Sequence, residues 1–154
     1  MLLTEQNIRI RELASATGIP ATRIGNWYDR GQVMPIAKQE DGWRIFSHAD
    51  VAKLAIVMRL IDWGARVEEA DHAAAEILFN GPMLTYRNAP AEALIAKFIP
   101  VVVVIWRDDG RIYFEILRRG EPLPGIPDTF LVIDVHAAIR QAFQRLREFR
   151  EAQQ

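Results

Sequence analysis

The chain has 154 residues, of which 50% are hydrophobic and 25% are charged, a composition typical of a globular protein. It has no cysteine, which excludes disulfides, thiolate metal sites and cysteine nucleophiles. The formal net charge of −1 excludes a broad basic surface, so a nucleic-acid-binding chain of this composition must use a few well-placed cations. We expect no signal peptide at the start, and the longest apolar run, residues 99–106, is too short to cross a bilayer.

The charge is distributed unevenly along the chain. Residues 1–66 contain nine Lys or Arg against seven Asp or Glu, a balance of +2, and residues 67–154 contain ten against thirteen, a balance of −3. The difference is small, but it favours the first part as the region that contacts an anionic partner.

The first elements form a pattern of two short helices joined by a tight turn. A strand-like segment at 7–10 precedes a helix over 11–17, which Gly18 ends as a C-terminal glycine does. Ile19-Pro20 forms the turn, because proline fits the first position of a helix. The second helix runs over 21–30 and ends at Gly31.

The second helix has an apolar face and a polar face. Ile24, Trp27 and Tyr28 share one side at helical spacing, and the opposite side presents Thr22, Arg23, Asn26 and Arg30. Such a helix, following a tight turn, fits the major groove of DNA. The alternative interpretation is the αα-hairpin of a plain helical bundle.

The segment that follows favours the DNA-binding interpretation. Gly42 permits a turn, Trp43 to Phe46 alternates as a strand does, and Ser47 with Asp50 resembles a capping box. A short hairpin that leads directly into a capped helix is the wing of a winged helix-turn-helix. Two further helices are expected over 48–62, ending at Trp63-Gly64, and over 67–79, ending at Gly81-Pro82.

Residues 8–70 resemble a MerR-type DNA-binding domain, and the resemblance extends to about residue 80. The matching motifs, in order, are Ile10-Arg11-Glu12-Leu13-Ala14, Gly18-Ile19, Asn26-Trp27, Gly42-Trp43-Arg44-Ile45-Phe46, Ser47 with Asp50, and Trp63-Gly64-Ala65. Three positions depart from the family pattern: Thr22 replaces an arginine, Asn26-Trp27 replaces paired tyrosines, and Arg66 replaces a serine cap. The resemblance therefore implies the fold more firmly than the individual base contacts.

The resemblance and the residue chemistry together predict the DNA contacts. Arg44 at the wing is expected to hold a phosphate through paired hydrogen bonds. Thr22, Arg23 and Asn26 are expected to face bases, since arginine suits guanine and asparagine suits adenine. The remaining candidates are Trp43, which either packs on the wing or touches DNA, Trp27, which is more a core residue than a contact, and Arg30 and Lys38, which would meet phosphates.

The second part predicts a small α+β unit. A short helix is expected over 90–98, and then strands over 101–106 and 112–117 joined by a turn at Asp108-Asp109-Gly110. A third strand is expected over 129–133, and Asp134 caps a last helix over 135–152. The fold class is thus α+β: an N-terminal winged helix-turn-helix at 1–80, then an antiparallel sheet with an amphipathic C-terminal helix at 81–154.

The last helix carries a long apolar face. It comprises Val135, Ala138, Ile139, Ala142, Phe143, Leu146 and Phe149. The face is expected to form a homodimer, because one small helix-turn-helix is usually doubled by symmetry. The alternative is that it only completes the core of its own chain. The long dimerisation helix usual in the family is missing, because Gly81-Pro82 breaks the chain and no heptad repeat follows.

Catalysis finds little support in the sequence. His48, His72 and His136 lie far apart and outside any metal or triad motif, and His48 is expected to be exposed at a helix start. Glu68, His72 and Glu76 share a helix face that could hold a metal, although a solvated charged face is the stronger interpretation. We expect no enzyme activity, no cofactor and no metal.

The sequence therefore predicts a cytoplasmic, sequence-specific transcriptional regulator that binds double-stranded DNA as a homodimer. By resemblance, it would occupy an inverted repeat and distort the DNA between half-sites. Two other functions stay open. The chain could be a DNA-architecture protein of a phage or mobile element, like an excisionase or a small terminase subunit. It could also be a ligand-responsive sensor through its C-terminal part, with an effector that the sequence does not identify.

Overall fold

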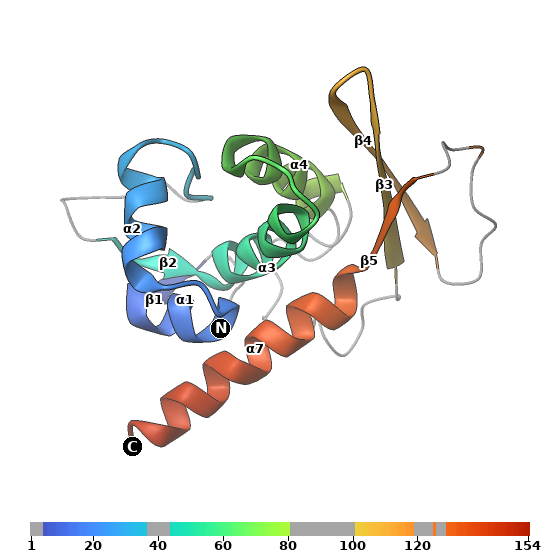
Figure 1. The fold of residues 1–154 in the computed structure, drawn as a ribbon. Coiled ribbons are helices and arrows are strands. Elements are labelled where there is room, and N and C mark those ends of the chain that lie inside the picture. The colour runs from blue at the N-terminus through green and yellow to red at the C-terminus, as the bar shows by residue number, and fades with distance from the viewer. Residues whose placement is uncertain (1–4, 37–43, 81–100, 119–124, 126–128) are drawn as a thin grey trace.

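The computed structural model describes residues 5–36, 44–80, 101–118, 125 and 129–154. Figure 1 shows a helical N-terminal part, a three-stranded sheet beside it, and a long C-terminal helix running beneath the N-terminal helices. The elements in chain order are β1 (Gln6–Ile8), α1 (Ile10–Thr17), α2 (Ala21–Asp29), β2 (Phe46–Ser47), α3 (His48–Asp62), α4 (Val67–Asn80), β3 (Val101–Asp108), β4 (Arg111–Arg118), β5 (Leu131–Asp134) and α7 (Val135–Ala152).

The predicted α+β class is confirmed by two antiparallel sheets. The first is a short pairing of β1 with β2, in which Ile8 lies opposite Phe46. The second has the strand order β4-β3-β5. Its hairpin turns through Asp109 and Gly110, which both have positive φ, 49° and 75°. Two such residues between antiparallel strands form the turn that matches the natural twist of a hairpin.

Two helix starts are set by the caps that the sequence predicts. The Ser47 hydroxyl accepts a hydrogen bond from the Asp50 N–H at 3.3 Å, and the Asp50 carboxylate accepts one from the Ser47 N–H at 2.9 Å. Asp134 accepts a hydrogen bond from the Ala137 N–H at 2.9 Å and begins α7. Each cap satisfies backbone N–H groups that the first turn of a helix leaves unpaired.

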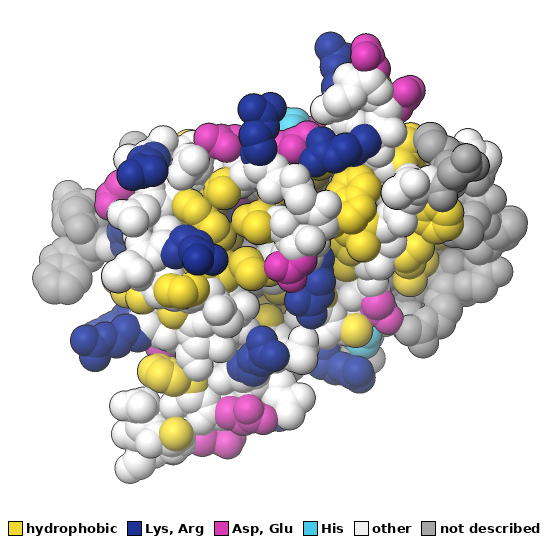
Figure 2. Space-filling view, viewed as in Figure 1, with side chains coloured by type: hydrophobic (Ala, Val, Ile, Leu, Met, Phe, Trp, Pro, Cys, Tyr) yellow, Lys and Arg dark blue, Asp and Glu magenta, His cyan; other side chains and the backbone are white. Residues whose placement is uncertain are grey.

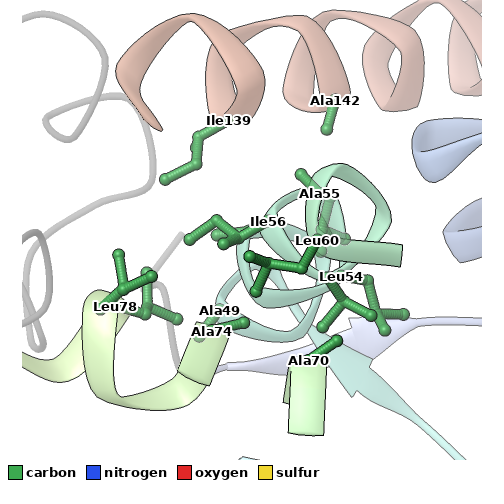
Figure 3. Close-up of a cluster of buried hydrophobic side chains, with 14 of the residues drawn as sticks. Ala49, Leu54, Ala55, Ile56, Leu60, Ala70, Ala74, Leu78, Ile139 and Ala142 are labelled. Atoms are coloured by element: carbon green, nitrogen blue, oxygen red, sulfur yellow. The ribbon is translucent and has the colours of Figure 1, made fainter. Parts of the chain in front are cut away.

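Helix α7 belongs to the same hydrophobic core as the N-terminal helices. It packs along α1 and α3, and one continuous cluster of buried side chains joins α1, α3, α4, β3 and α7. Figure 3 shows Ile139 and Ala142 of α7 pointing toward α3, with Ala70, Ala74 and Leu78 of α4 on the other side of that helix. The apolar face of α7 is thus buried within its own chain, as the core-completing alternative requires. The division into domains at residue 80 stays a prediction.

Some expectations are wrong or fall outside the described residues. His48 was expected on the surface, but it is only 8% exposed and its ring meets Phe143 edge-on, with the centroids 5.2 Å apart. The reason is that α7 covers the first turn of α3, a contact between distant segments. The third strand begins at Leu131 instead of residue 129. The expected helix over 90–98 lies outside the described residues.

Candidate DNA-binding site

The helix-turn-helix is built by α1, a glycine turn and α2. Gly18 follows α1 with φ 75°, and its N–H donates to the Ala14 carbonyl oxygen at 2.8 Å, which closes the helix. A residue with a Cβ atom would be strained in this left-handed conformation. Leu13, Ile19 and Ile24 are buried beneath the turn and fix the angle between the two helices.

The outer face of α2 is polar and accessible. Thr22, Arg23, Asn26 and Arg30 are all exposed, whereas Ile24 and Trp27 are buried. Trp27 is 7% exposed and lies in the core, as its sequence pattern favoured. The four exposed side chains offer cationic, hydroxyl and amide groups on one side of a helix, which is the chemistry of base and phosphate recognition.

Arg44 attaches the segment that precedes β2 to α2. Its Nη1 donates to the Gly25 carbonyl oxygen at 3.1 Å, and its Nη2 forms an ion pair with the Asp29 carboxylate. The guanidinium also lies over the ring of Tyr28, 6.0 Å from its centroid. The Arg44 side chain remains 35% exposed, so part of its five-donor fork still faces solvent. Lys38 and Trp43 lie outside the described residues.

The segment after α2 is held by buried carboxylates that sequence reasoning missed. The Asp71 carboxylate accepts the Met34 N–H at 3.1 Å, and the Asp50 carboxylate accepts the Ile36 N–H at 3.0 Å. Lys53, whose side chain is 2% exposed, pairs with Asp71 at 2.7 Å and donates to the Met34 carbonyl oxygen. These groups connect the chain that leaves the recognition helix to α3 and α4.

Tyr28 lies close to this buried network. Its hydroxyl is inaccessible to solvent, and its ring packs on Phe46 with the centroids 5.1 Å apart. Burial, reinforced by the negative charges of Asp50 and Asp71, raises the pKa of Tyr28 far above its usual value. The phenol is therefore neutral at any physiological pH.

Comparison with known families identifies the N-terminal part. Residues 8–77 match the family described as MerR HTH family regulatory protein. Residues 8–77 form a MerR-family helix-turn-helix domain. Domains of this family bind DNA in transcription regulators, so residues 8–77 are the DNA-binding part of the chain. No curated protein matches the chain.

A groove opens on the surface away from the polar face of α2. The groove lies between the C-terminal end of α3, strand β5 and the first half of α7, and its volume is about 710 Å³. Its lining combines charged, aromatic and apolar side chains: Arg59, Arg140, Asp62, Asp134, Trp63, Leu131 and Ile133. Small-molecule sites have volumes of about 300–1,000 Å³ and a similar mixture of groups.

The histidine-carboxylate face of α4 is solvated. His72 pairs with Glu76 at 3.1 Å, and the two side chains are 79% and 49% exposed, as on a solvated face. Within the described ranges, no group of three or more His, Asp or Glu side chains is placed to hold a metal ion. In the same residues, no helix combines the length and apolar character that crossing a membrane requires.

Proposed function

We propose that this protein is a sequence-specific regulator that binds an inverted-repeat DNA site as a homodimer. The observation that carries the proposal is the polar outer face of α2, where Arg23 and Asn26 are exposed while the inner face is buried in the core. Arg23 and Asn26 would read base edges, and Thr22 and Arg30 would contact bases or adjacent phosphates. A cytoplasmic location accords with this role.

The proposed role of Arg44 follows from its two neighbours on α2. The ion pair with Asp29 and the hydrogen bond to Gly25 use two of its donors and fix the wing against the recognition helix. The remaining donors would hold a DNA phosphate beside the groove that α2 enters. Arg44 would thus set the angle of the wing and contact the DNA backbone at once.

The dimer requires a surface other than the apolar face of α7, which is already buried. The outer face of the C-terminal sheet is the better candidate. Register places Trp106, Tyr113 and Val132 on one side of the sheet, and the Trp106 and Tyr113 rings stack with centroids 6.1 Å apart. Tyr113 is 42% exposed and Val132 is 46% exposed. A twin molecule would cover these side chains and place two α2 helices on one DNA site.

Selection of bound sequences from a random DNA pool tests the function. The expected result is a palindromic consensus with half-sites about one helical turn apart, or a multiple of it. Several tandem sites at a DNA end would favour the phage or mobile-element role instead. No enrichment over the starting pool contradicts the proposal.

The dimer surface is tested by the variant Val132→Glu. Sedimentation is expected to show a dimer for the wild type and a monomer for the variant, because a buried carboxylate without a partner is costly. Met34→Glu is a matched control, since Met34 is 61% exposed and lies on the N-terminal part. Dimers that persist in Val132→Glu would place the interface elsewhere.

The groove supports a second candidate function, a ligand-responsive switch. Its walls come from both α3 and the C-terminal unit. Arg59 and Arg140 would pair with the carboxylate of a small organic acid. Asp62 and Asp134 in the same groove would favour an acid that also carries a hydrogen-bond donor. A bound acid at one hundred times its dissociation constant would raise the stability by about 2.7 kcal/mol. Thermal shifts with a panel of aromatic carboxylates test this. The variant Ala137→Trp, which fills the groove, is expected to abolish any shift.

A further inference from the structure

The C-terminal helix lies directly beside the helix-turn-helix. Near its end, Arg150 Nε pairs with the Glu12 carboxylate at 2.6 Å, and Arg150 Nη2 donates to the Asn7 carbonyl oxygen at 3.3 Å. Further back, Arg59 of α3 donates to the Gln141 side chain at 3.2 Å. These contacts, with the packing of Leu146 in the core, fix α7 along α1 and α3. In Figure 1, α7 runs beneath α1 toward the C-terminus.

This arrangement brings one arginine of α7 to the turn before the recognition helix. Arg145 Nη1 lies 3.8 Å from the position that a Cβ atom on Gly18 would occupy. Gly18 is exposed and stands three residues before the first residue of α2. The N-terminal end of a recognition helix is the part that approaches DNA most closely. Arg145 therefore stands at the margin of the DNA-facing surface, although it is 127 residues away from Gly18 in sequence.

The N-terminal part carries little net positive charge, so an additional cation beside Gly18 would contribute noticeably to DNA binding. Residues 1–66 carry only +2, and Asp29 already neutralises part of the charge of Arg44. Figure 2 shows Lys and Arg side chains scattered over the visible face instead of gathered in one patch. Arg145 is exposed, and no carboxylate of the described residues forms an ion pair with it. Its full charge is available to a phosphate.

We propose that Arg145 binds a DNA phosphate next to the groove entered by α2, so that the C-terminal helix is part of the DNA-binding surface. The proposal rests on the DNA-binding function proposed above. Sequence reasoning assigned α7 to dimerisation or the core, because nothing local connects Arg145 with Gly18. The competing role is structural: a cation near the C-terminal end of α1 also stabilises that helix through its dipole.

Salt-dependent DNA binding of the full-length variant Arg145→Gln distinguishes these roles. One lost phosphate contact makes the slope of log affinity against log salt shallower by about 0.9. The advantage of the wild type over the variant is then about 3.5-fold larger at 50 mM than at 200 mM salt. The loss is expected to be the same on specific and random duplexes, because a phosphate contact carries no sequence information.

The control is Arg147→Gln, which removes the same charge from an exposed arginine on α7, two residues and about 200° of helical turn away from Arg145. Its slope is expected to equal that of the wild type. Equal slopes for Arg145→Gln and the wild type would overturn the proposal. If the slope is unchanged but the melting temperature is lower, Arg145 stabilises α1 through the helix dipole instead. If the wild type binds no DNA at all, the proposed function fails instead, so the two failures are distinguishable.

Discussion

Removal of the Lys53 ammonium should destabilise the protein severely. The side chains of Lys53 and Asp71 are only 2% and 9% exposed, and their charged atoms lie 2.7 Å apart. In the variant Lys53→Met, the Asp71 carboxylate stays buried without its cation. Breaking a buried pair from one side costs about 3–5 kcal/mol, a large part of a total stability of about 5–15 kcal/mol. For a chain of this size, the melting temperature would fall by about 6–20 °C.

A second substitution isolates the electrostatic part of this cost. Asp71→Asn retains an oxygen that can accept the Met34 N–H, but it removes the negative charge. The double variant Lys53→Met/Asp71→Asn is therefore expected to be more stable than Lys53→Met alone, by about 1–3 kcal/mol. Denaturant titrations followed by circular dichroism measure both free energies of unfolding.

An exposed pair provides the comparison. Arg107 and Glu69 interact at 3.0 Å, with 37% and 22% of the side chains exposed, and Arg107→Met should cost about 1 kcal/mol or less. The reasoning is refuted if Lys53→Met costs no more than Arg107→Met. It is also refuted if the added Asp71→Asn substitution lowers the stability further.

Three further predictions concern DNA binding, pH and packing. Arg44→Ala should weaken DNA binding on all sequences alike. In gel-shift titrations it should flatten the slope of log affinity against log salt concentration by about one unit. An unchanged slope would mean that the wing does not contact DNA. The folded state raises the pKa of Tyr28 above the value near 10 that it has in the unfolded chain. The free energy of unfolding is therefore unaffected by the titration of this group below pH 10, and above pH 10 it declines by about 1.4 kcal/mol per pH unit. Tyr28→Phe should remove that decline in denaturant titrations at pH 9–11, and identical curves for the two proteins would contradict it. Leu146→Ala should cost about 2–5 kcal/mol in the same titrations, since Leu146 is 2% exposed in the core, whereas a cost below 1 kcal/mol would mean that α7 is loosely packed.

The elements that could be predicted from the sequence are those set by neighbouring residues. Helix α3 occupies the expected range 48–62 because Ser47 and Asp50 cap it, and α7 occupies 135–152 because Asp134 caps it. The β3–β4 hairpin follows from a turn of Asp109 and Gly110, in which both residues adopt positive φ. In each case the signal lies within a few residues of the boundary that it sets.

The features that could not be predicted depend on contacts between distant segments. Lys53 reads as an ordinary surface lysine of an amphipathic helix, and only the fold reveals Asp71 beside it. Likewise, the ion pair of Arg44 with Asp29 joins the wing to a helix fifteen residues earlier. The exposed face of α2 was predictable because helical periodicity alone separates Asn26 from Trp27. The sequence contains the partners of these long-range pairs but no signal that matches them.

Helix α3 connects the two ends of the molecule that the proposals assign to DNA and to a small ligand. It begins at the Ser47 cap, directly after the strand that carries the wing, and ends beside Trp63 at the groove. Its fifteen residues span about 22 Å, and no glycine or proline interrupts them. Because most side chains of α3 are buried against α4 and α7, a small rotation imposed at the groove would have to shift the packing of these helices together and would displace the base of the wing with them. A ligand in the groove would then change the position of Arg44 relative to α2, and with it the affinity of the protein for DNA.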